Sequence, residues 1–388
     1  MRGVAIVGVG QTKFGVSTET SRSLGVKALL DALDDAGTNG REIQAAYVGH
    51  YGLLDRQKGL IGHLVLSDAG ITQRSPIPIT RVEDACSSGA VALREAYIAV
   101  AGGFYDVAVA LGVEKMTHLP TIEALTGMAQ GREQDIEGVM GMNPIGIYGM
   151  KARLHMERYG TSEEQLALVA VKSYKNAASN PYAHFQKNIT KEDVLNSPSI
   201  SPPLHRYNFC PFSDGAAAAI LVSEDLVKKY TDTPVYVAAS VQKSGFFDDS
   251  GDLLTERVLG DTAVEAYEKA GISAKDVDLA EVHDASSIAE ILAYEALGFC
   301  PEGEGGKFVE EGQSQIGGST PVNASGGLTA KGHPVGATGL GQTFEAVKQL
   351  RGEAGKIQVP HPEYVLTHTM GGLYRGEECN KVVHIFKR

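Results

Sequence analysis

The chain repeats its own pattern of helix and strand at an offset of 234 residues. Residues 32–37 (ALDDAG) end an amphipathic helical pattern, and residues 266–271 (AYEKAG) end a second pattern in the same way. At this offset Val48, in the strand expected after the first helix, falls on Val282. A period of this length is too long for a solenoid. The repeat therefore predicts two related α/β halves.

Apolar runs of strand length alternate with helical patterns in both halves. The glycines that close the first apolar run predict a turn at its end. Alternation of this kind is typical of an α/β fold, with a mostly parallel sheet covered by helices on both faces. We expect strands at 4–10, 45–49, 107–113 and 235–239, and helices at 22–36 and from about Cys86 to residue 96.

Residues 116–209 interrupt the repeat. We therefore assign residues 1–115 and 210–232 to the N-terminal half, 116–209 to an inserted loop domain, and 233–388 to the C-terminal half. Within the insertion, residues 161–164 (TSEE) predict a capping box at the start of a helix. A long excursion from a rigid core usually forms a substrate wall, and the methionines of this segment would make such a wall adaptable.

Charge and composition exclude several classes of protein. The 35 Lys+Arg and 47 Asp+Glu give a formal net charge of −12 without a basic block, so no nucleic-acid partner is expected. No run reaches the roughly 18 apolar residues of a membrane span, and no signal peptide is visible. The four cysteines form neither a CxxC pair nor a zinc spacing, which predicts free thiols in the cytoplasm and no metal site in this chain.

Cys86 stands where an expected strand ends and a helix begins. The free N–H groups of a helix N-terminus would lower the pKa of its thiol and make it nucleophilic. A buried structural cysteine explains the same pattern equally well. Cys210, Cys300 and Cys379 have no comparable setting, and packing is the better interpretation of each.

Three further segments carry polar groups at strand ends or in glycine-rich turns: 331–339 (KGHPVGATG), 281–287 (EVHDASS) and 366–372 (LTHTMGG). The first holds a histidine that could be the base for a cysteine, or merely a turn histidine. The second follows a strand, where parallel sheets carry their sites. The third ends in amides suited to an oxyanion hole. The candidates are His333 in the first, His283, Asp284 and Ser286 in the second, and His368, Gly371 and Gly372 in the third.

Together these four segments resemble the thiolase superfamily over nearly the whole chain. The most specific matches are residues 84–89 (DACSSG) and 332–339 (GHPVGATG), and the His-Asp pair is similar to the sterol-carrier-protein-type and archaeal branch. The resemblance implies a five-layered αβαβα fold of two βαβαβαββ halves packed through their central helices. It also implies that Cys86 accepts the acyl group, that His333 takes its proton, and that His283 binds the substrate carbonyl or enolate.

One departure from the family concerns its second, acid/base cysteine. The C-x-G turn that carries this cysteine in most thiolases reads HTMGG at 368–372 here. In the sterol-carrier-protein type the second cysteine follows His-Asp, where this chain has Ala285. Either His368, Ser286 or His283 then protonates the enolate, or the leaving carbanion needs less help. The departure favours a degradative cleavage over acetoacetyl-CoA formation.

The resemblance leaves three hypotheses for the activity. The leading one is CoA-dependent acyl transfer, in which a 3-oxoacyl-CoA is cleaved or formed through acyl-Cys86 with coenzyme A as a substrate. A retro-aldolase acting on a β-hydroxyacyl-CoA is the second, although it would not need Cys86, and a non-catalytic CoA-binding subunit is the third. The family also implies a homodimer and, as in benzoylsuccinyl-CoA thiolase, a small zinc-ribbon/OB-fold partner that would hold any zinc.

Overall fold

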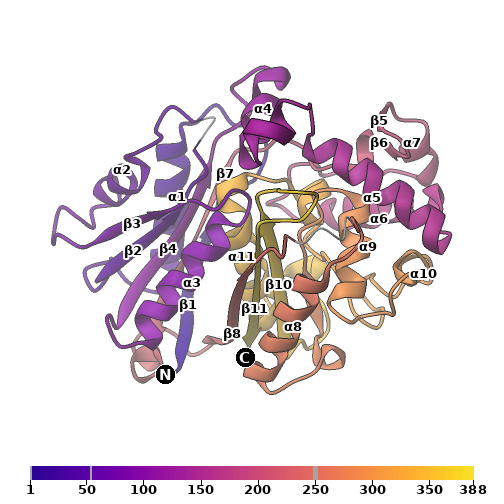
Figure 1. The fold of residues 1–388 in the computed structure, drawn as a ribbon. Helices are drawn as coiled ribbons and strands as arrows, with labels where there is room; N and C mark the ends of the chain where they lie inside the picture. The colour runs from indigo at the N-terminus through magenta and orange to yellow at the C-terminus, as the bar shows by residue number, and fades with distance from the viewer. Residues whose placement is uncertain (1, 53–54, 248–251) are drawn as a thin grey trace.

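The computed structural model describes residues 2–52, 55–247 and 252–388 (Figure 1). Within these residues one mixed sheet of nine strands has the order β3-β2-β4-β7-β1-β8-β11-β10-β9. The first half contributes β1 (Val4–Gln11), β2 (Ala45–Gly49), β3 (Ile79–Val82), β4 (Val107–Glu114) and β7 (Gly215–Ser223). The second half contributes β8 (Val235–Ser244), β9 (Leu279–Glu281), β10 (Tyr364–Gly371) and β11 (Asn380–Lys387).

The sheet has an approximate two-fold symmetry: read outward from its centre, equivalent strands of the two halves follow in the same order. In the middle β1 pairs antiparallel with β8, with Ala5 opposite Tyr236. Outward from this pair lie β7 and β11, then β4 and β10, then β2 and β9. A parallel bridge between Ala280 and Val322 takes the place beside β9 that β3 has beside β2. This approximate two-fold arrangement confirms the two related halves.

The prediction of a mostly parallel sheet is wrong. β2 pairs in parallel with β3 and β4, and β9 with β10, whereas the other neighbouring strands of the sheet are antiparallel. The last strand of the second half, β11, follows β10 through the short connection 372–379. A short connection cannot cross over the sheet as a helix does, so β11 has to run back along β10.

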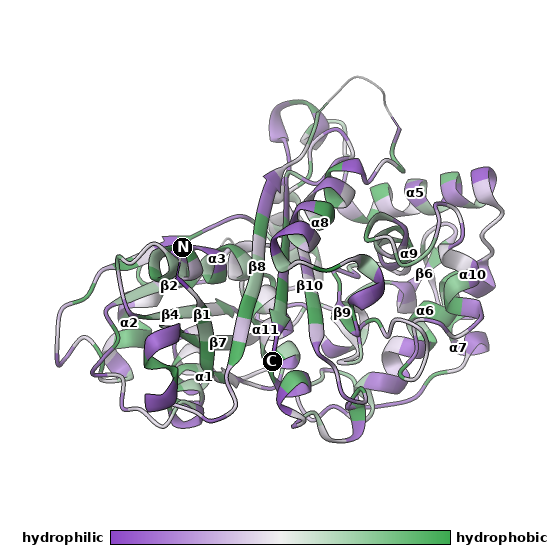
Figure 2. Cartoon of the chain, turned by 90° about the horizontal axis from the view of Figure 1, so that it is seen from below, coloured by the Kyte–Doolittle hydropathy of each residue, from purple (hydrophilic) through white to green (hydrophobic). Residues whose placement is uncertain are grey.

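Helices form three layers around this sheet (Figure 2). α3 (Ser88–Ala101) and α11 (Thr338–Arg351) pack against each other between the two halves. α1 (Ser21–Asp35) and α2 (Ile61–Asp68) cover the outer face of the first half. α8 (Arg257–Ala270) covers the outer face of the second half, and α9 (Ser287–Ala296) packs on α8. With the two half-sheets these layers give the predicted five.

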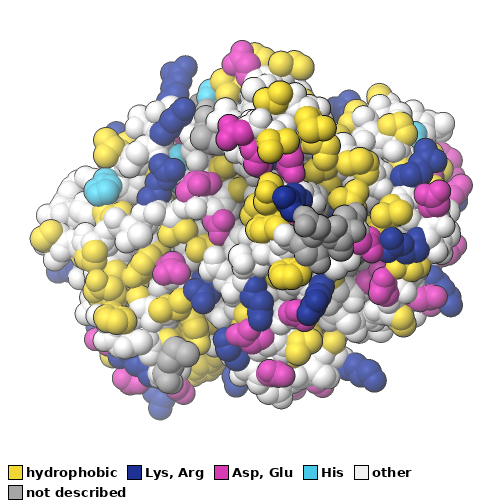
Figure 3. Space-filling model, in the orientation of Figure 1, with side chains coloured by type: hydrophobic (Ala, Val, Ile, Leu, Met, Phe, Trp, Pro, Cys, Tyr) yellow, Lys and Arg dark blue, Asp and Glu magenta, His cyan; other side chains and the backbone are white. Residues whose placement is uncertain are grey.

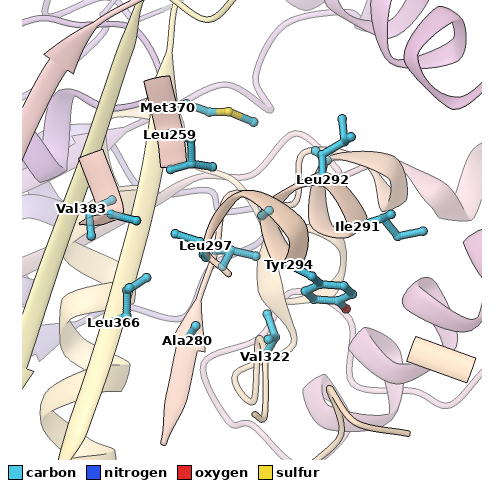
Figure 4. Close-up of a cluster of buried hydrophobic side chains, with 14 of the residues drawn as sticks. Leu259, Ala280, Ile291, Leu292, Tyr294, Leu297, Val322, Leu366, Met370 and Val383 are labelled. Atoms are coloured by element: carbon cyan, nitrogen blue, oxygen red, sulfur yellow. The ribbon is translucent and has the colours of Figure 1, made fainter. Parts of the chain in front are cut away.

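The side chains of β1 alternate between the two cores that its faces cover. Val4 and Ile6 enter the central core with α3 and α11, whereas Ala5 and Val7 enter the outer core with α1. The outer core of the second half is shown in Figure 4, where Leu259 of α8, Leu366 of β10 and side chains of α9 lie together. The expected strand 45–49 and helix 22–36 are thus found almost unchanged.

The glycines of β1 do not form the turn that the sequence predicted. β1 continues through Gly8 and Gly10 to Gln11. A Cβ at Gly8 would lie 2.3 Å from the carbonyl oxygen of Ala32, and one at Gly10 would lie 2.2 Å from that of Ala28. These glycines therefore allow α1 to lie directly on the strand.

The segment between β4 and β7 folds mainly into helices. It contains α4 (Thr121–Met128), α5 (Pro144–Tyr159), α6 (Glu163–Ala177), α7 (Lys191–Leu195) and the hairpin β5 (Ser199–Ser201) and β6 (Leu204–His205). The capping box of α6 joins Ser162 to Gln165, one residue later than the predicted pair. α6 packs on α9 and on α10 (Gly305–Glu310). In the described ranges, every helix is too short or too polar to pass through a bilayer.

Candidate active site

Cys86 lies in a tight turn between β3 and α3. The residue before it, Ala85, has φ 46°, in the left-handed region that a residue with a Cβ rarely adopts. The Ser87 hydroxyl donates to the carbonyl oxygen of Asp84 at 2.7 Å and accepts from the Asn380 amide at 2.8 Å. Since Asn380 belongs to β11, the second half of the fold holds this strained turn of the first half in place.

The His333 loop of the second half packs backbone to backbone against the first half. A Cβ at Gly336 would lie 2.8 Å from the carbonyl oxygen of Val113, and one at Gly89 would lie 2.7 Å from that of Gly336. The buried Glu114 carboxylate, at the end of β4, accepts the N–H of Gly336 at 3.1 Å. The predicted turn needs its glycines because the backbones of the two halves are in direct contact there.

Three predicted site residues come together at this junction. Sγ of Cys86 and one ring nitrogen each of His283 and His333 lie within 4.8 Å of one another. The two imidazole rings are 5.1 Å apart between centroids and nearly perpendicular, at 86°. A thiolate and two imidazoles can also bind a soft metal ion. The same three groups, at the same spacing, form a nucleophile with a neighbouring base.

The tautomer of His333 follows from its hydrogen bonds. The Thr338 hydroxyl donates to the carbonyl oxygen of Pro334 at 3.1 Å and therefore accepts from Nδ1–H of His333, at 2.7 Å. Nε2 of His333 is buried and has no hydrogen-bond partner in the described structure. Its lone pair is thus free to take a proton, as a base must do.

The resting charges of the site differ from the sequence-based expectation. Burial, together with the nearby charge of Glu114, raises the pKa of the Cys86 thiol to about 12. Burial lowers the pKa of His333 well below its usual range and that of His283 to about 3. The prediction that the helix N-terminus lowers the thiol pKa is wrong, because desolvation of the thiolate outweighs it. A neutral thiol thus faces two neutral imidazoles.

Cys86, His283 and His333 line a cavity of about 600 Å³. Segment 116–209 supplies much of the apolar wall, as the sequence predicted, and Figure 3 shows hydrophobic side chains gathered over α4 and toward α5. Of the methionines, Met128 and Met370 line the cavity. The apolar wall residues from this segment include Ile122, Leu125, Met128, Pro144, Ile145, Tyr148 and Ile200.

The predicted glycine turn also borders the cavity. Gly371 and Gly372 are both lining residues, and Gly372 has φ 70°. A Cβ at Gly371 would lie 2.3 Å from the carbonyl oxygen of Asp84 and 2.6 Å from Oγ of Ser87. Gly371 therefore packs directly on the Cys86 turn, and any side chain would displace the nucleophile.

The other three predicted residues, Asp284, Ser286 and His368, do not line the cavity. The buried Asp284 carboxylate accepts the N–H of Leu328 at 2.6 Å and that of Thr329 at 3.1 Å. It thereby holds the loop that leads to His333. Ser286, before α9, and His368, within β10, are likewise buried.

Sequence reasoning missed Cys210, which it assigned to packing. Cys210 lines the same cavity as Cys86, and its N–H donates to the carbonyl oxygen of Ala285 at 3.1 Å. No motif around Cys210 signals this position. It arises from the pairing of Phe209 with Ser286, which are 77 residues apart in the chain. Glu378 and Tyr148 are two further lining residues that carried no sequence signal.

A half-buried cysteine beside a neutral imidazole, in an apolar cavity lined by both duplicated α/β halves, defines a thiolase-type acyltransferase. The chain belongs to the thiolase family. The family model "Thiolase, N-terminal domain" matches residues 4–225, and "Thiolase C-terminal domain-like" matches residues 239–388. The first match ends just after β7, and the second begins within β8.

Relatives support this assignment over the full length. The chain is 46% identical over 393 residues to an acetyl-CoA acetyltransferase of Methanothermobacter thermautotrophicus, covering 100% of both. It is 40% identical to "Benzoylsuccinyl-CoA thiolase subunit BbsB" of Thauera aromatica, covering 96% of this chain and 95% of the relative. Sterol carrier protein 2 of Bos taurus is 39% identical over 95% of this chain and 70% of its own length.

The fold also has a close structural match. A solved structure titled "Ltp2-ChsH2(DUF35) aldolase" superposes with a TM-score of 0.79 and 24% identity. The match covers 98% of this chain and 97% of that chain. At this identity the likeness concerns the fold.

Proposed function

We propose that the protein cleaves or forms a 3-oxoacyl-CoA through an acyl-Cys86 intermediate. The observation that supports this most directly is that Cys86, His283 and His333 lie within 4.8 Å of one another in the lining of an apolar cavity. Coenzyme A is the acyl acceptor in the cleavage direction. The apolar wall favours an acyl chain without charge at its far end.

In the cleavage direction His333 Nε2 takes the proton of the Cys86 thiol as sulfur attacks the 3-oxo carbon. Collapse of the adduct breaks the bond between C2 and C3, leaves the acyl group on Cys86 and releases the enolate of a shorter acyl-CoA. His283, which also lines the cavity, is placed to hold the enolate oxygen by a hydrogen bond. Coenzyme A then takes the acyl group from Cys86, which gives ping-pong kinetics.

We further propose that the chain works as a homodimer and with a small zinc-ribbon/OB-fold partner. Three observations support the partner. One relative is named as a subunit, and the structural match is titled with two components. In addition, Ile122, Ile136, Val139 and Met140 of segment 116–209 are exposed apolar side chains. The molecular mass in solution, measured alone and after co-expression with such a partner, tests both statements.

The chemistry is tested by intact-mass measurement after incubation with a panel of acyl-CoAs. We expect one acyl adduct, located on Cys86 by peptide mapping, and release of one CoA per chain. Cys86→Ala abolishes the adduct, whereas the matched variant Cys300→Ala, outside the lining residues of the cavity, keeps it. Cleavage products without CoA consumption, and without an adduct, would replace this function by retro-aldol cleavage.

A further inference from the structure

Cys210 occupies a defined place next to the residues of the site. Phe209 and Ser286 form an antiparallel bridge, and the N–H of Cys210 donates to the carbonyl oxygen of Ala285 at 3.1 Å. Cys210 and Ala285 are thus opposite each other on paired backbones. Side chains of opposite residues in such a pair point to the same face, about 5 Å apart.

That shared face is the cavity. Ala285 and Cys210 are both lining residues, and Ala285 follows the His283-Asp284 pair directly. The Cys210 side chain is half-buried, and desolvation together with the charge of a Cys86 thiolate raises the pKa of its thiol above the usual range. The charge on the Cys86 sulfur therefore affects the pKa of the Cys210 thiol.

The reaction needs a proton donor that the residues so far assigned do not supply. His333 carries the Cys86 proton, and its other nitrogen is held by Thr338. His368 and Ser286 lie outside the cavity lining. Because its pKa is raised, the Cys210 thiol is protonated at neutral pH and has a proton to give at the position opposite Ala285.

We propose that Cys210 is the second catalytic cysteine, the group that transfers the proton at C2 of the substrate. This inference rests on the proposed acyl transfer. In cleavage the Cys210 S–H protonates C2 of the enolate as that product forms, and Cys210 becomes a thiolate. The Cys210 thiolate then takes the S–H proton of coenzyme A, whose thiolate attacks the acyl-Cys86 carbonyl. Cys86 leaves as a thiolate and recovers its proton from His333, so all protons balance.

The experiment separates acylation of Cys86 from proton transfer at C2. Acylation is measured by intact mass with acetyl 5-thio-2-nitrobenzoate, because this thiolate leaving group is stable without a proton. Proton transfer is measured as deuterium incorporation at C2 of acetyl-CoA in heavy water. The variants are Cys210→Ser, which keeps the volume but is a far weaker acid, and Cys210→Ala. Cys300→Ala is the matched control.

We expect Cys210→Ser and Cys210→Ala to be acylated at Cys86 as fast as the parent chain, with deuterium incorporation reduced roughly 100-fold or more. Deuterium incorporation within threefold of the parent in either variant would overturn the proposal. Equal loss of acylation and incorporation would also overturn it, because Cys210 would then only support the site. A parent chain that is not acylated would contradict the proposed function itself.

Discussion

The hydroxyl oxygen of Thr338 lies 2.7 Å from Nδ1 of His333, and both residues belong to the turn that enters α11. Because the Thr338 hydroxyl donates its hydrogen to the carbonyl oxygen of Pro334, it can only accept from His333, which fixes the proton of the ring on Nδ1. The base is thus oriented by a neighbour five residues away in the chain. This contrasts with a catalytic histidine that is oriented by a distant carboxylate.

Replacing Thr338 by valine removes the acceptor for Nδ1–H while nearly conserving volume. We expect kcat to fall about 10- to 100-fold with a smaller change in KM, because the ring loses its fixed tautomer rather than substrate contacts. Steady-state kinetics measures this. Thr343→Val is the matched control, since the Thr343 hydroxyl also bonds a carbonyl within α11, that of Gly339 at 2.9 Å. Equal losses of kcat in both variants would count against the tautomer argument.

The raised pKa of Cys86, about 12, predicts how its alkylation depends on pH. Because only the thiolate reacts, the rate of alkylation by iodoacetamide should rise about tenfold per pH unit between pH 6 and 9, without a plateau. Peptide mapping against time gives the rate for Cys86 alone. A plateau with a midpoint below pH 8 would show instead that the helix N-terminus or a histidinium holds the thiolate.

His368 provides a prediction for stability against pH. Burial, assisted by the charge of Lys381, lowers its pKa from 6.5 to about 3. The unfolded chain binds this proton below pH 6.5 and the folded chain does not, so folding stability falls as the pH falls from 6.5 toward 3. In His368→Leu the loss of unfolding free energy between pH 7 and pH 5 should be smaller by about 2 kcal/mol. Urea unfolding at the two pH values measures it, and an unchanged difference would show that His368 is protonated in the fold.

Zinc should inhibit the enzyme at its nucleophile. Cys86, His283 and His333 offer one sulfur and two nitrogen atoms within 4.8 Å, a soft set of ligands that suits Zn²⁺ and not Mg²⁺. We expect micromolar Zn²⁺ to block acylation, Mg²⁺ to have no effect, and dialysis against EDTA to leave full activity. Activity that is lost with EDTA and restored by zinc would instead assign a resident metal to these residues.

The sequence predicts the elements of this fold better than it predicts their directions. Apolar periodicity located β2 at Ala45–Gly49 and α1 at Ser21–Asp35 because burial selects those side chains. It carried no information about strand direction, since buried parallel and antiparallel strands have the same apolar pattern. Glycines at 8 and 10 were misread for a related reason: their neighbour, α1, is a tertiary contact.

In the site, motifs located three side chains that the fold brings together, and burial determined their charge states. Cys86, His283 and His333 were located from turns and strand ends. The direction of the thiol pKa was wrong because the helix N-terminus is visible in the sequence and the desolvating cavity is not. Cys210 was missed because its position in the cavity depends on the pairing of Phe209 with Ser286, which only the folded chain brings together.

The approximate two-fold order of the strands places the proposed nucleophile and the proposed base at equivalent positions of the two halves. Cys86 lies between the third strand of its half and the central helix α3, and His333 lies between the Val322 bridge and the central helix α11. These are equivalent connections of the two related halves. The proposed nucleophile thus comes from one half and the proposed base from the other, so neither half on its own holds both groups.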